Sequence, residues 1–193
     1  MTQSKNLLIA ITGGIGSGKS MLSNILKEKG YTVYSADEVY AELLKCPNFV
    51  NKVSEIVGVL PSGETLDRKA VASVVFSNPE KLKALNEFTH EKVMEKLLSL
   101  SRGKGVVFNE VPLLFESGYE SLYDKVIVVI RPLELRVKSV VERDGLCEEE
   151  VYKRIKNQFN YENLEKDKHT VIINDSDILS FKNKVETVIN EIL

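Results

Sequence analysis

The sequence contains little of what disulfide-linked, zinc-binding or membrane proteins require. Its 193 residues include only two cysteines, Cys46 and Cys147, and only two histidines. Two cysteines are too few for a disulfide framework at this length, and no Cys/His spacing resembles a zinc site. No apolar run approaches the roughly 20 residues of a membrane-spanning helix. We therefore expect no disulfide scaffold, no structural zinc and no membrane partner.

The chain also lacks a strong charge of either sign. It has 26 Lys and Arg against 28 Asp and Glu, a formal net charge of −2. Nucleic-acid-binding domains usually carry a basic surplus, so we expect no nucleic-acid partner. The apolar stretch at residues 7–12 is too short for a signal peptide, which predicts a cytoplasmic protein. The composition does not indicate an oligomeric state.

Short apolar segments alternate with amphipathic helical segments along the chain. The apolar segments predict strands, which lie at residues 7–11, 31–35, 106–110, 125–130 and 170–173. Helices are predicted at residues 19–29 and 177–192. Strands separated by helices indicate an α/β fold with a parallel five-stranded sheet and right-handed crossovers.

A glycine-rich loop follows the first predicted strand. It matches the pattern G-x-x-x-x-G-K-[ST] in full, with the residues Gly13, Gly14, Ile15, Gly16, Ser17, Gly18, Lys19 and Ser20. Such a P-loop surrounds nucleotide phosphates with backbone N–H groups and the start of the next helix. Lys19 would reach the β- and γ-phosphates of ATP, and the Ser20 hydroxyl would ligate Mg²⁺.

The P-loop alone leaves the reaction open. A GTPase would carry Asn-Lys-x-Asp to recognise guanine, but the pairs Asn51-Lys52 and Asn183-Lys184 lack the aspartate. A small-molecule kinase, a regulatory module that binds nucleotide without turnover, and a P-loop protein acting on nucleic acid all remain. The acidic charge balance argues against the last of these.

Two acidic residues stand at the ends of predicted strands, where ligands bind in doubly wound sheets. Asp37 follows the second strand and could accept the proton of an acceptor hydroxyl, or it could simply cap a helix. Glu110 ends the third strand and could hold Mg²⁺ through a water molecule, or form a salt bridge. Glu116 could contact substrate or lie on the surface.

The last third of the chain offers several arginines for phosphate recognition. The candidates are Arg131, Arg136, Arg143 and Arg154, and the pattern does not choose among them. Arg143 ends a predicted helix in a loop, so it could move onto the ATP phosphates and stabilise the charge of the transition state. It could equally be a solvated cation at a helix end.

At this point several segments together resemble the dephospho-CoA kinase family, in the family's order and over nearly the whole chain. They are TGGIGSGKS at residues 12–20, SAD at 35–37, LDR at 66–68, VFSNP at 75–79 with His90, EVPLLFE at 110–116, ERDGL at 142–146, Arg154 with Gln158, and Asn174. The P-loop is generic, whereas EVPLLFE together with LDR is specific to the family.

The resemblance implies an ATP-dependent kinase that phosphorylates the 3′-hydroxyl of the ribose of dephospho-CoA, the last step of coenzyme A synthesis. Asp37 would then be the catalytic base beside Lys19, and Arg143 the lid arginine on ATP. Substrate contacts would come from Asp37, Arg68, His90 and Glu116. The family architecture implies one P-loop kinase domain, with a core at about 1–37, 104–134 and 169–193, a helical CoA-binding insertion at about 38–103 and a lid at about 135–168.

The chain departs from the family pattern in several places, among them His90-Glu91, where the family usually has His-Pro, and Glu110, where aspartate is also common. Lys168 and His169 stand where the family tends to show Ala-Asp, and residues 174–176 replace its Asn-x-Gly, so the adenine contacts from this region are not indicated by the resemblance. Cys147 takes a helix N-cap position where serine is typical. Because a poor cap costs roughly 0.5–2 kcal/mol, we predict a more mobile lid.

Overall fold

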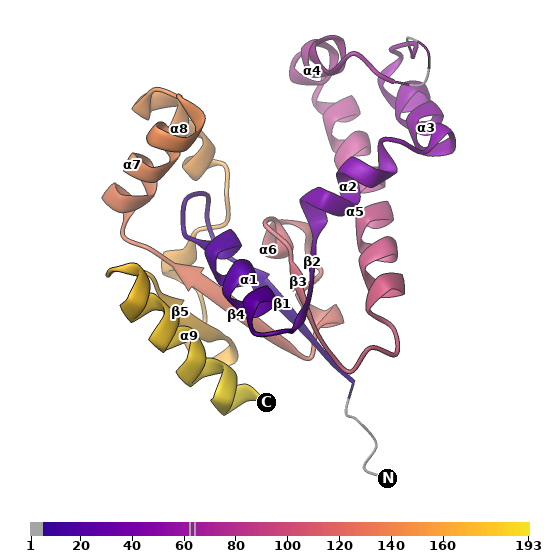
Figure 1. Cartoon of the computed structure of the whole chain (residues 1–193). Coiled ribbons are helices and arrows are strands. Elements are labelled where there is room, and N and C mark those ends of the chain that lie inside the picture. Colours follow the sequence, from indigo (N-terminus) through magenta and orange to yellow (C-terminus); the bar gives the residue numbers. More distant parts are fainter. Residues whose placement is uncertain (1–5, 62, 64) are drawn as a thin grey trace. The chain divides into compact units, whose positions relative to one another are not determined.

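The structure is a computed structural model that describes residues 6–61, 63 and 65–193 (Figure 1). Residues 1–5 of the predicted core lie outside this range. Contacts within the chain divide it into two compact units. One unit is Ser35–Arg102, and the other comprises the described residues on either side of it.

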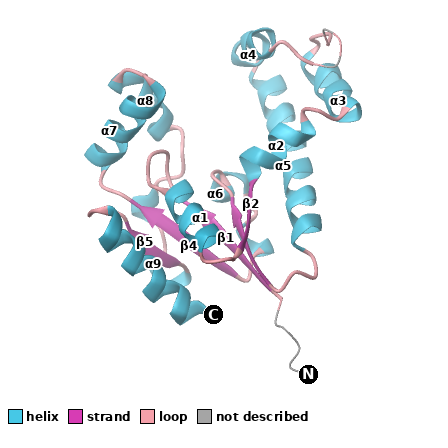
Figure 2. Ribbon diagram, in the orientation of Figure 1, coloured by secondary structure: helices cyan, strands magenta, loops and turns pink. Residues whose placement is uncertain are grey.

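Five strands form one sheet, drawn as magenta arrows in Figure 2. They are β1 (Leu7–Thr12), β2 (Thr32–Ser35), β3 (Val106–Glu110), β4 (Lys125–Ile130) and β5 (Thr170–Ile173), in the order β2-β3-β1-β4-β5. Strand β1 is central and pairs in parallel with both neighbours, so that Ile9 lies opposite Phe108 on one side and Lys125 on the other. Such a strand is buried on both faces, which explains its continuous apolar run.

Helices α1 (Lys19–Glu28) and α9 (Ile178–Ile192) pack against each other and the sheet. Their apolar stripes join alternate strand residues in one core cluster, whose fully buried members include Ile9, Ile11, Leu22, Leu26, Phe108, Ile127, Phe181 and Val185. This cluster fixes α1, and therefore the loop before it, to the carboxyl end of β1.

The other helical elements of this unit follow β3 and β4. They are α6 (Leu114–Ser117), α7 (Leu133–Asp144), α8 (Glu148–Lys156) and three 3-10 turns, Glu120–Leu122, Tyr161–Asn163 and Lys166–Lys168. Val137 and Val140 of α7 pack on Val151 of α8, and Ile15 from the glycine loop joins this small cluster. The tip of the loop is therefore held by the α7–α8 pair.

The described residues of the second unit form the helices α2 (Ala36–Leu43), α3 (Pro47–Val57), α4 (Arg68–Ser77) and α5 (Pro79–Ser101). Phe49 and Val53 of α3 pack on Val75 of α4, and the ring of Phe49 stacks on that of Phe88 in α5 at 5.3 Å between centroids. These apolar contacts hold the four helices together as a small core.

The parallel five-stranded sheet and its flanking helices confirm the predicted fold class. The structure departs from sequence periodicity at one place: Val151, Ile155 and Phe159 have the spacing of one packed helical face, but α8 ends at Lys156. A tertiary contact explains the early end of the helix. The ring of Phe159 packs against that of Phe115, with 4.7 Å between the ring centroids, and does not continue the helical face of Val151 and Ile155. In the part of the chain that the structure describes, no helix has the length and apolar character to cross a membrane.

Candidate active site

The glycine loop at residues 13–20 connects β1 to α1, as the motif requires. Gly18 is the N-cap of α1 with φ of 105°, and no side chain caps this helix among the described residues. The first turn of α1 contains no acidic residue. The N–H groups and the positive end of the helix dipole therefore face the loop, which makes this helix start suitable for binding an anion.

Two glycines of the loop are required by their surroundings. Gly16 has φ of 74°, and a Cβ atom there would lie 2.7 Å from the carbonyl oxygen of Arg136. A Cβ at Gly18 would lie 2.4 Å from the side-chain nitrogen of Asn174. Both positions combine left-handed backbone with close contact, so only glycine allows the loop this path.

Lys19 and Ser20 stand where the motif predicts phosphate and metal contacts. The Lys19 ammonium donates to the carbonyl oxygens of Gly13 at 2.7 Å and Gly14 at 3.1 Å, so it lies across the inside of the loop. The Ser20 hydroxyl donates to the Glu110 carboxylate at 3.0 Å. The structure thus joins the end of β3 to the start of α1 through a direct hydrogen bond.

Glu110 is the buried acid of this site, with an exposed fraction of 7%. Its second carboxylate oxygen accepts a hydrogen bond from the hydroxyl of Ser23 at 2.6 Å. The salt bridge considered for Glu110 is not among the ion pairs of the described residues, and two hydroxyl groups stabilise the carboxylate instead. Ser23 lies one helical turn after Lys19 and outside the P-loop pattern, which ends at Ser20, so the pattern does not identify it.

A group of side chains outside the motif binds the backbone of the loop. Arg136 of α7 donates from Nε to the carbonyl of Ile15 at 2.9 Å, and Gln158 accepts the Ile15 N–H at 2.8 Å. The buried Asn174 donates to the carbonyl of Ser17 at 2.9 Å. Burial lowers the pKa of Arg136 from its ordinary value. The Ile15 N–H, expected to contact ATP, is therefore engaged by Gln158 in this structure.

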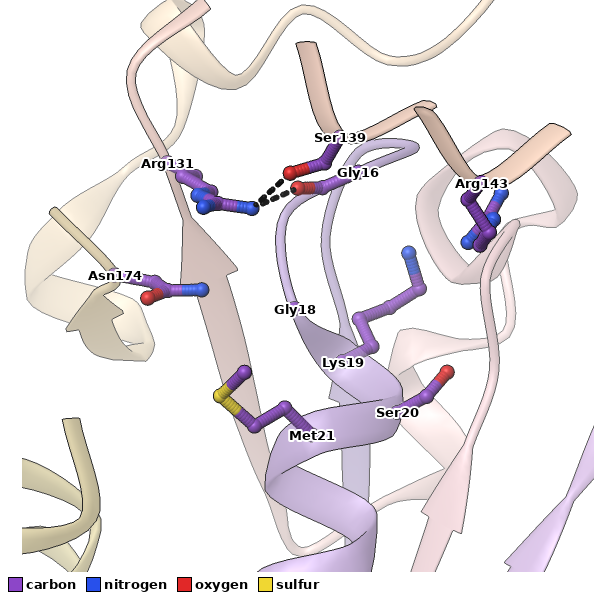
Figure 3. Close-up of a pocket in the computed structure, with 9 residues that line it drawn as sticks. All are labelled: Gly16, Gly18, Lys19, Ser20, Met21, Arg131, Ser139, Arg143 and Asn174. Carbon is purple, nitrogen blue, oxygen red and sulfur yellow. Dashed lines mark hydrogen bonds between the residues drawn. The ribbon is translucent and has the colours of Figure 1, made fainter. Parts of the chain in front are cut away.

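A pocket of about 150 Å³ opens beside the loop (Figure 3). It is lined by Gly16, Gly18, Lys19, Ser20, Met21, Arg131, Ser139, Arg143 and Asn174. Of the four arginines that the sequence left open, Arg131 and Arg143 line this pocket, Arg136 binds the loop, and the exposed Arg154 is not among the lining residues.

Arg143 lies near the end of α7 on the same side of the loop as Lys19 and Ser20 (Figure 3). Its guanidinium forms two hydrogen bonds with Asp144, at 2.7 and 2.9 Å, and its side chain is 62% exposed. The hydrogen bond to Asp144 raises the pKa of Arg143, and the same bond lowers the pKa of Asp144. An exposed pair of this kind is weak, so Arg143 can exchange Asp144 for a phosphate at little cost.

Glu116 of α6 is part of a contact with the segment after α8. Its carboxylate accepts the Phe159 N–H at 2.8 Å, beside a cluster formed by the rings of Phe115, Phe159, Tyr161 and His169. Burial raises the pKa of the Tyr161 phenol to about 12. Glu116 therefore helps to hold the segment between α8 and β5 in place.

The remaining predicted site residues belong to the second unit. Asp37 is the second residue of α2 and is exposed; Ser35 is the N-cap, so the interpretation of Asp37 as the cap is wrong. Arg68 begins α4 next to its N-cap Asp67, and the half-buried His90 lies in α5. Burial raises the pKa of Tyr40, while the nearby charge of Arg68 acts in the opposite direction.

Cys147 is the N-cap of α8, as predicted from the sequence. Its backbone N–H donates to the carboxylate of Glu150 at 3.1 Å, which is half of a capping box. This hydrogen bond is the main reason why the pKa of Glu150 is lowered. The start of the helix is thus stabilised by Glu150, a contribution that the prediction of a poor cap did not include.

Comparisons with known proteins agree with the motifs. A family model described as dephospho-CoA kinase matches residues 7–180. A dephospho-CoA kinase of Fusobacterium nucleatum is 37% identical over 184 residues, which cover 93% of this chain and 95% of that protein. A dephospho-CoA kinase of Chlorobaculum tepidum is 38% identical over 199 residues, covering 97% of this chain and 95% of that protein.

Solved structures give the same result. The dephospho-CoA kinase of Campylobacter jejuni has a TM-score of 0.72 at 32% identity and covers 97% of both chains. A gluconokinase of Sinorhizobium meliloti and a shikimate kinase of Acinetobacter baumannii, at 12% and 11% identity, share the fold with a TM-score of 0.55. The P-loop, the acid at the end of β3 and the arginines on α7 thus occur in a chain that matches one kinase family over nearly its whole length, and the chain belongs to the dephospho-CoA kinase family.

Proposed function

We propose that this protein transfers the γ-phosphoryl group of ATP to the 3′-hydroxyl of the ribose of dephospho-CoA, giving coenzyme A and ADP. The observation that carries the proposal is the complete P-loop, with the Lys19 ammonium inside it, in a chain of the dephospho-CoA kinase family. Family membership makes the protein an ATP-dependent kinase. The roles of single residues below are our proposals.

The phosphate side of the reaction is assigned to the loop and to α7. The N–H groups at the start of α1 would hold the β-phosphate, and Lys19 would leave the Gly13 and Gly14 carbonyls for the β- and γ-phosphate oxygens. Arg143 would exchange Asp144 for the transferred phosphoryl group. These cations stabilise the charge that spreads over the γ-phosphate oxygens during transfer.

Ser20 as a direct ligand and Glu110 through a water molecule would suit Mg²⁺, because this ion prefers hard oxygen donors and usually keeps several waters. The Ser20 proton points to Glu110, which leaves the lone pairs of the Ser20 oxygen for a metal ion. Among the described residues no cluster of three or more His, Cys, Asp or Glu side chains could hold a metal. Magnesium in kinases relies mostly on phosphates and waters, so two protein groups are sufficient. When bound, the ion would neutralise charge on the β- and γ-phosphates.

On the acceptor side, Asp37 would be the general base. It would accept the proton of the 3′-hydroxyl as the ribose oxygen forms its bond to the γ-phosphorus, and the bond from that phosphorus to the β–γ bridging oxygen breaks to release ADP. Its place two residues after the end of β2 supports this role. Arg68, His90 and Glu116 would bind dephospho-CoA.

The domain roles follow the same proposal. Residues at about 38–103 would bind the CoA moiety, and residues at about 135–168 would act as a lid over ATP. The structure supports the second role through Arg143, which α7 places at the pocket. A cytoplasmic location, and the absence of nucleic-acid or membrane partners, remain predictions.

A coupled assay of ADP release tests the function. Purified protein is mixed with Mg-ATP and dephospho-CoA, and in parallel with a panel of nucleosides and shikimate. We expect ADP release only with dephospho-CoA, and a loss of about 10²–10⁴-fold in Asp37→Asn. Glu38→Gln, which removes the adjacent exposed carboxylate, is the matched control and should keep most of the activity.

Other outcomes separate the alternatives. Activity on another acceptor would keep the kinase chemistry and reject dephospho-CoA as substrate. Nucleotide binding without turnover on any acceptor would favour a regulatory module. Full activity in Asp37→Asn would leave the function standing and reject Asp37 as the base.

A further inference from the structure

Arg131 has contacts that neither the P-loop nor the proposed catalysis explains. It directly follows Ile130, the last residue of β4, and its Nη1 donates to Ser139 at 2.8 Å and to the Gly16 carbonyl at 3.4 Å. Its Nε is buried and has no hydrogen-bond partner. None of the ion pairs found among the described residues includes Arg131. A half-buried guanidinium without a carboxylate partner is available for an electron-rich ligand.

Arg131 and Lys19 lie on different sides of the loop in Figure 3, although both donate to carbonyl oxygens of it. The N–H groups of a P-loop bind phosphate, and Lys19 is the residue of the motif that reaches the phosphates. Arg131 donates to the carbonyl of Gly16, and Asn174 donates to the carbonyl of Ser17. Figure 3 shows both side chains on one side of the loop. Lys19 and Arg143 lie on the opposite side of it in Figure 3, where the phosphates are expected.

The part of the pocket that Arg131 and Met21 line offers side chains suited to binding a flat aromatic ring. Arg131 contributes a planar cation that two acceptors hold in place, and Met21 of α1 contributes a thioether. Guanidinium groups stack on aromatic faces, and sulfur atoms make favourable contacts with ring edges. Because Ser139 and Gly16 fix the guanidinium before the ligand arrives, stacking costs little side-chain entropy.

We propose that Arg131 is the residue on which the nucleotide base stacks. This inference rests on the proposed function only in that the ligand is a nucleotide. Arg131 would contribute to the affinity for nucleoside phosphates through the ring, with no contact to the phosphates. Ser139 would act as a positioning residue that keeps the guanidinium in the stacking orientation.

The test compares two ligands with the same number of phosphates, ADP and inorganic pyrophosphate, by isothermal titration calorimetry. We expect Arg131→Ala to weaken ADP binding about tenfold, a typical loss for a desolvated cation–π contact, and to change pyrophosphate binding less than twofold. Arg131→Lys keeps the positive charge but removes the planar guanidinium, so its loss of ADP affinity should resemble that of Arg131→Ala. Ser139→Ala should give a smaller loss, again confined to ADP. Arg154→Ala, which removes an exposed arginine of α8, is the matched control.

Each outcome decides the proposal. An equal loss for ADP and pyrophosphate would place Arg131 on the phosphates, and no loss for either would make it purely structural; both overturn stacking. The ratio of the two affinities does not depend on the folded fraction, because both ligands bind the same folded protein, so partial unfolding of a variant does not disguise the result. No dephospho-CoA is used, so failure here is distinct from failure of the acceptor assay.

Discussion

The Glu110 carboxylate accepts hydrogen bonds from the hydroxyls of Ser20 and Ser23, whose surroundings differ. This difference predicts that replacing one serine affects stability and replacing the other affects turnover. Ser23 is 3% exposed and donates at 2.6 Å, whereas Ser20 is exposed and donates at 3.0 Å. Only Ser20 lines the pocket. We expect Ser23→Ala to lower stability with little effect on turnover, and Ser20→Ala to lower turnover with little effect on stability.

The expected magnitudes follow from the burial of each bond. A hydrogen bond to a charged acceptor contributes about 1.5–3 kcal/mol. Ser23→Ala leaves one oxygen of the buried Glu110 without its donor, so we expect a loss of about 2 kcal/mol in the free energy of unfolding. At about 2–4 °C per kcal/mol for a chain of this size, Tm would fall by about 4–8 °C. Water can replace the exposed hydroxyl of Ser20, so Ser20→Ala should cost less than about 1 kcal/mol.

The assay measures thermal melting together with acceptor-dependent ADP release over a range of Mg²⁺ concentrations. Ser20→Ala should lower kcat about 100-fold and raise the Mg²⁺ concentration needed for half-maximal rate, because a metal ligand is lost. Ser23→Ala should keep kcat within about threefold below its own Tm. If both variants lose activity equally and Ser23→Ala melts at the wild-type temperature, the assignment of a structural and a metal-binding hydroxyl is refuted.

Four further predictions concern the loop, Arg143 and the start of α8. Gly16→Ala forces a Cβ to 2.7 Å from a backbone oxygen, so ADP binding by calorimetry should fall at least tenfold, whereas Gly145→Ala, with similar φ of 67° but no atom within 4 Å, should leave it nearly unchanged. Arg143→Ala should lower kcat about 100-fold or more, with a change of less than threefold in ADP affinity; a loss of ADP affinity as large as the loss in kcat would reject its proposed role in the transition state. Cys147→Ser should slow amide hydrogen exchange in the first turn of α8 by adding a better cap, and unchanged exchange contradicts the predicted mobile lid. Because the pKa of Glu150 is lowered from 4.5, its capping contribution is present above pH 4.5 and is lost as pH falls through the lowered value, so exchange of the same amides, corrected for intrinsic rates, should accelerate in acid.

The positions of most strands along the chain and the identity of the phosphate site could be predicted from local sequence. Strands β3, β4 and β5 begin and end at the predicted residues, because short runs of β-branched residues between polar segments leave few alternatives. The loop at residues 13–20 was equally clear, since a complete P-loop pattern combines glycines of special backbone geometry with Lys19 and Ser20 at fixed spacing.

The end of α8 shows where local reasoning fails. Val151 and Ile155 have helical spacing to Phe159, and periodicity alone extends the helix to that residue. The helix instead stops at Lys156, since Gln158 accepts the Ile15 N–H and Phe159 donates to Glu116, two contacts over more than 40 residues of sequence. Neither partner can be identified from the sequence around α8.

The sequence by itself determined the fold class, the phosphate-binding loop and the kinase family, because these depend on patterns that are local or that follow one another in a fixed order. Only the tertiary structure decided the use of the arginines and of Glu110. Arg131 and Arg136 differ from Arg154 in that the folded chain brings them to the carbonyl oxygens of Gly16 and Ile15. Spacing along the chain carries no information about such contacts, since they depend on how β4 and α7 pack beside β1.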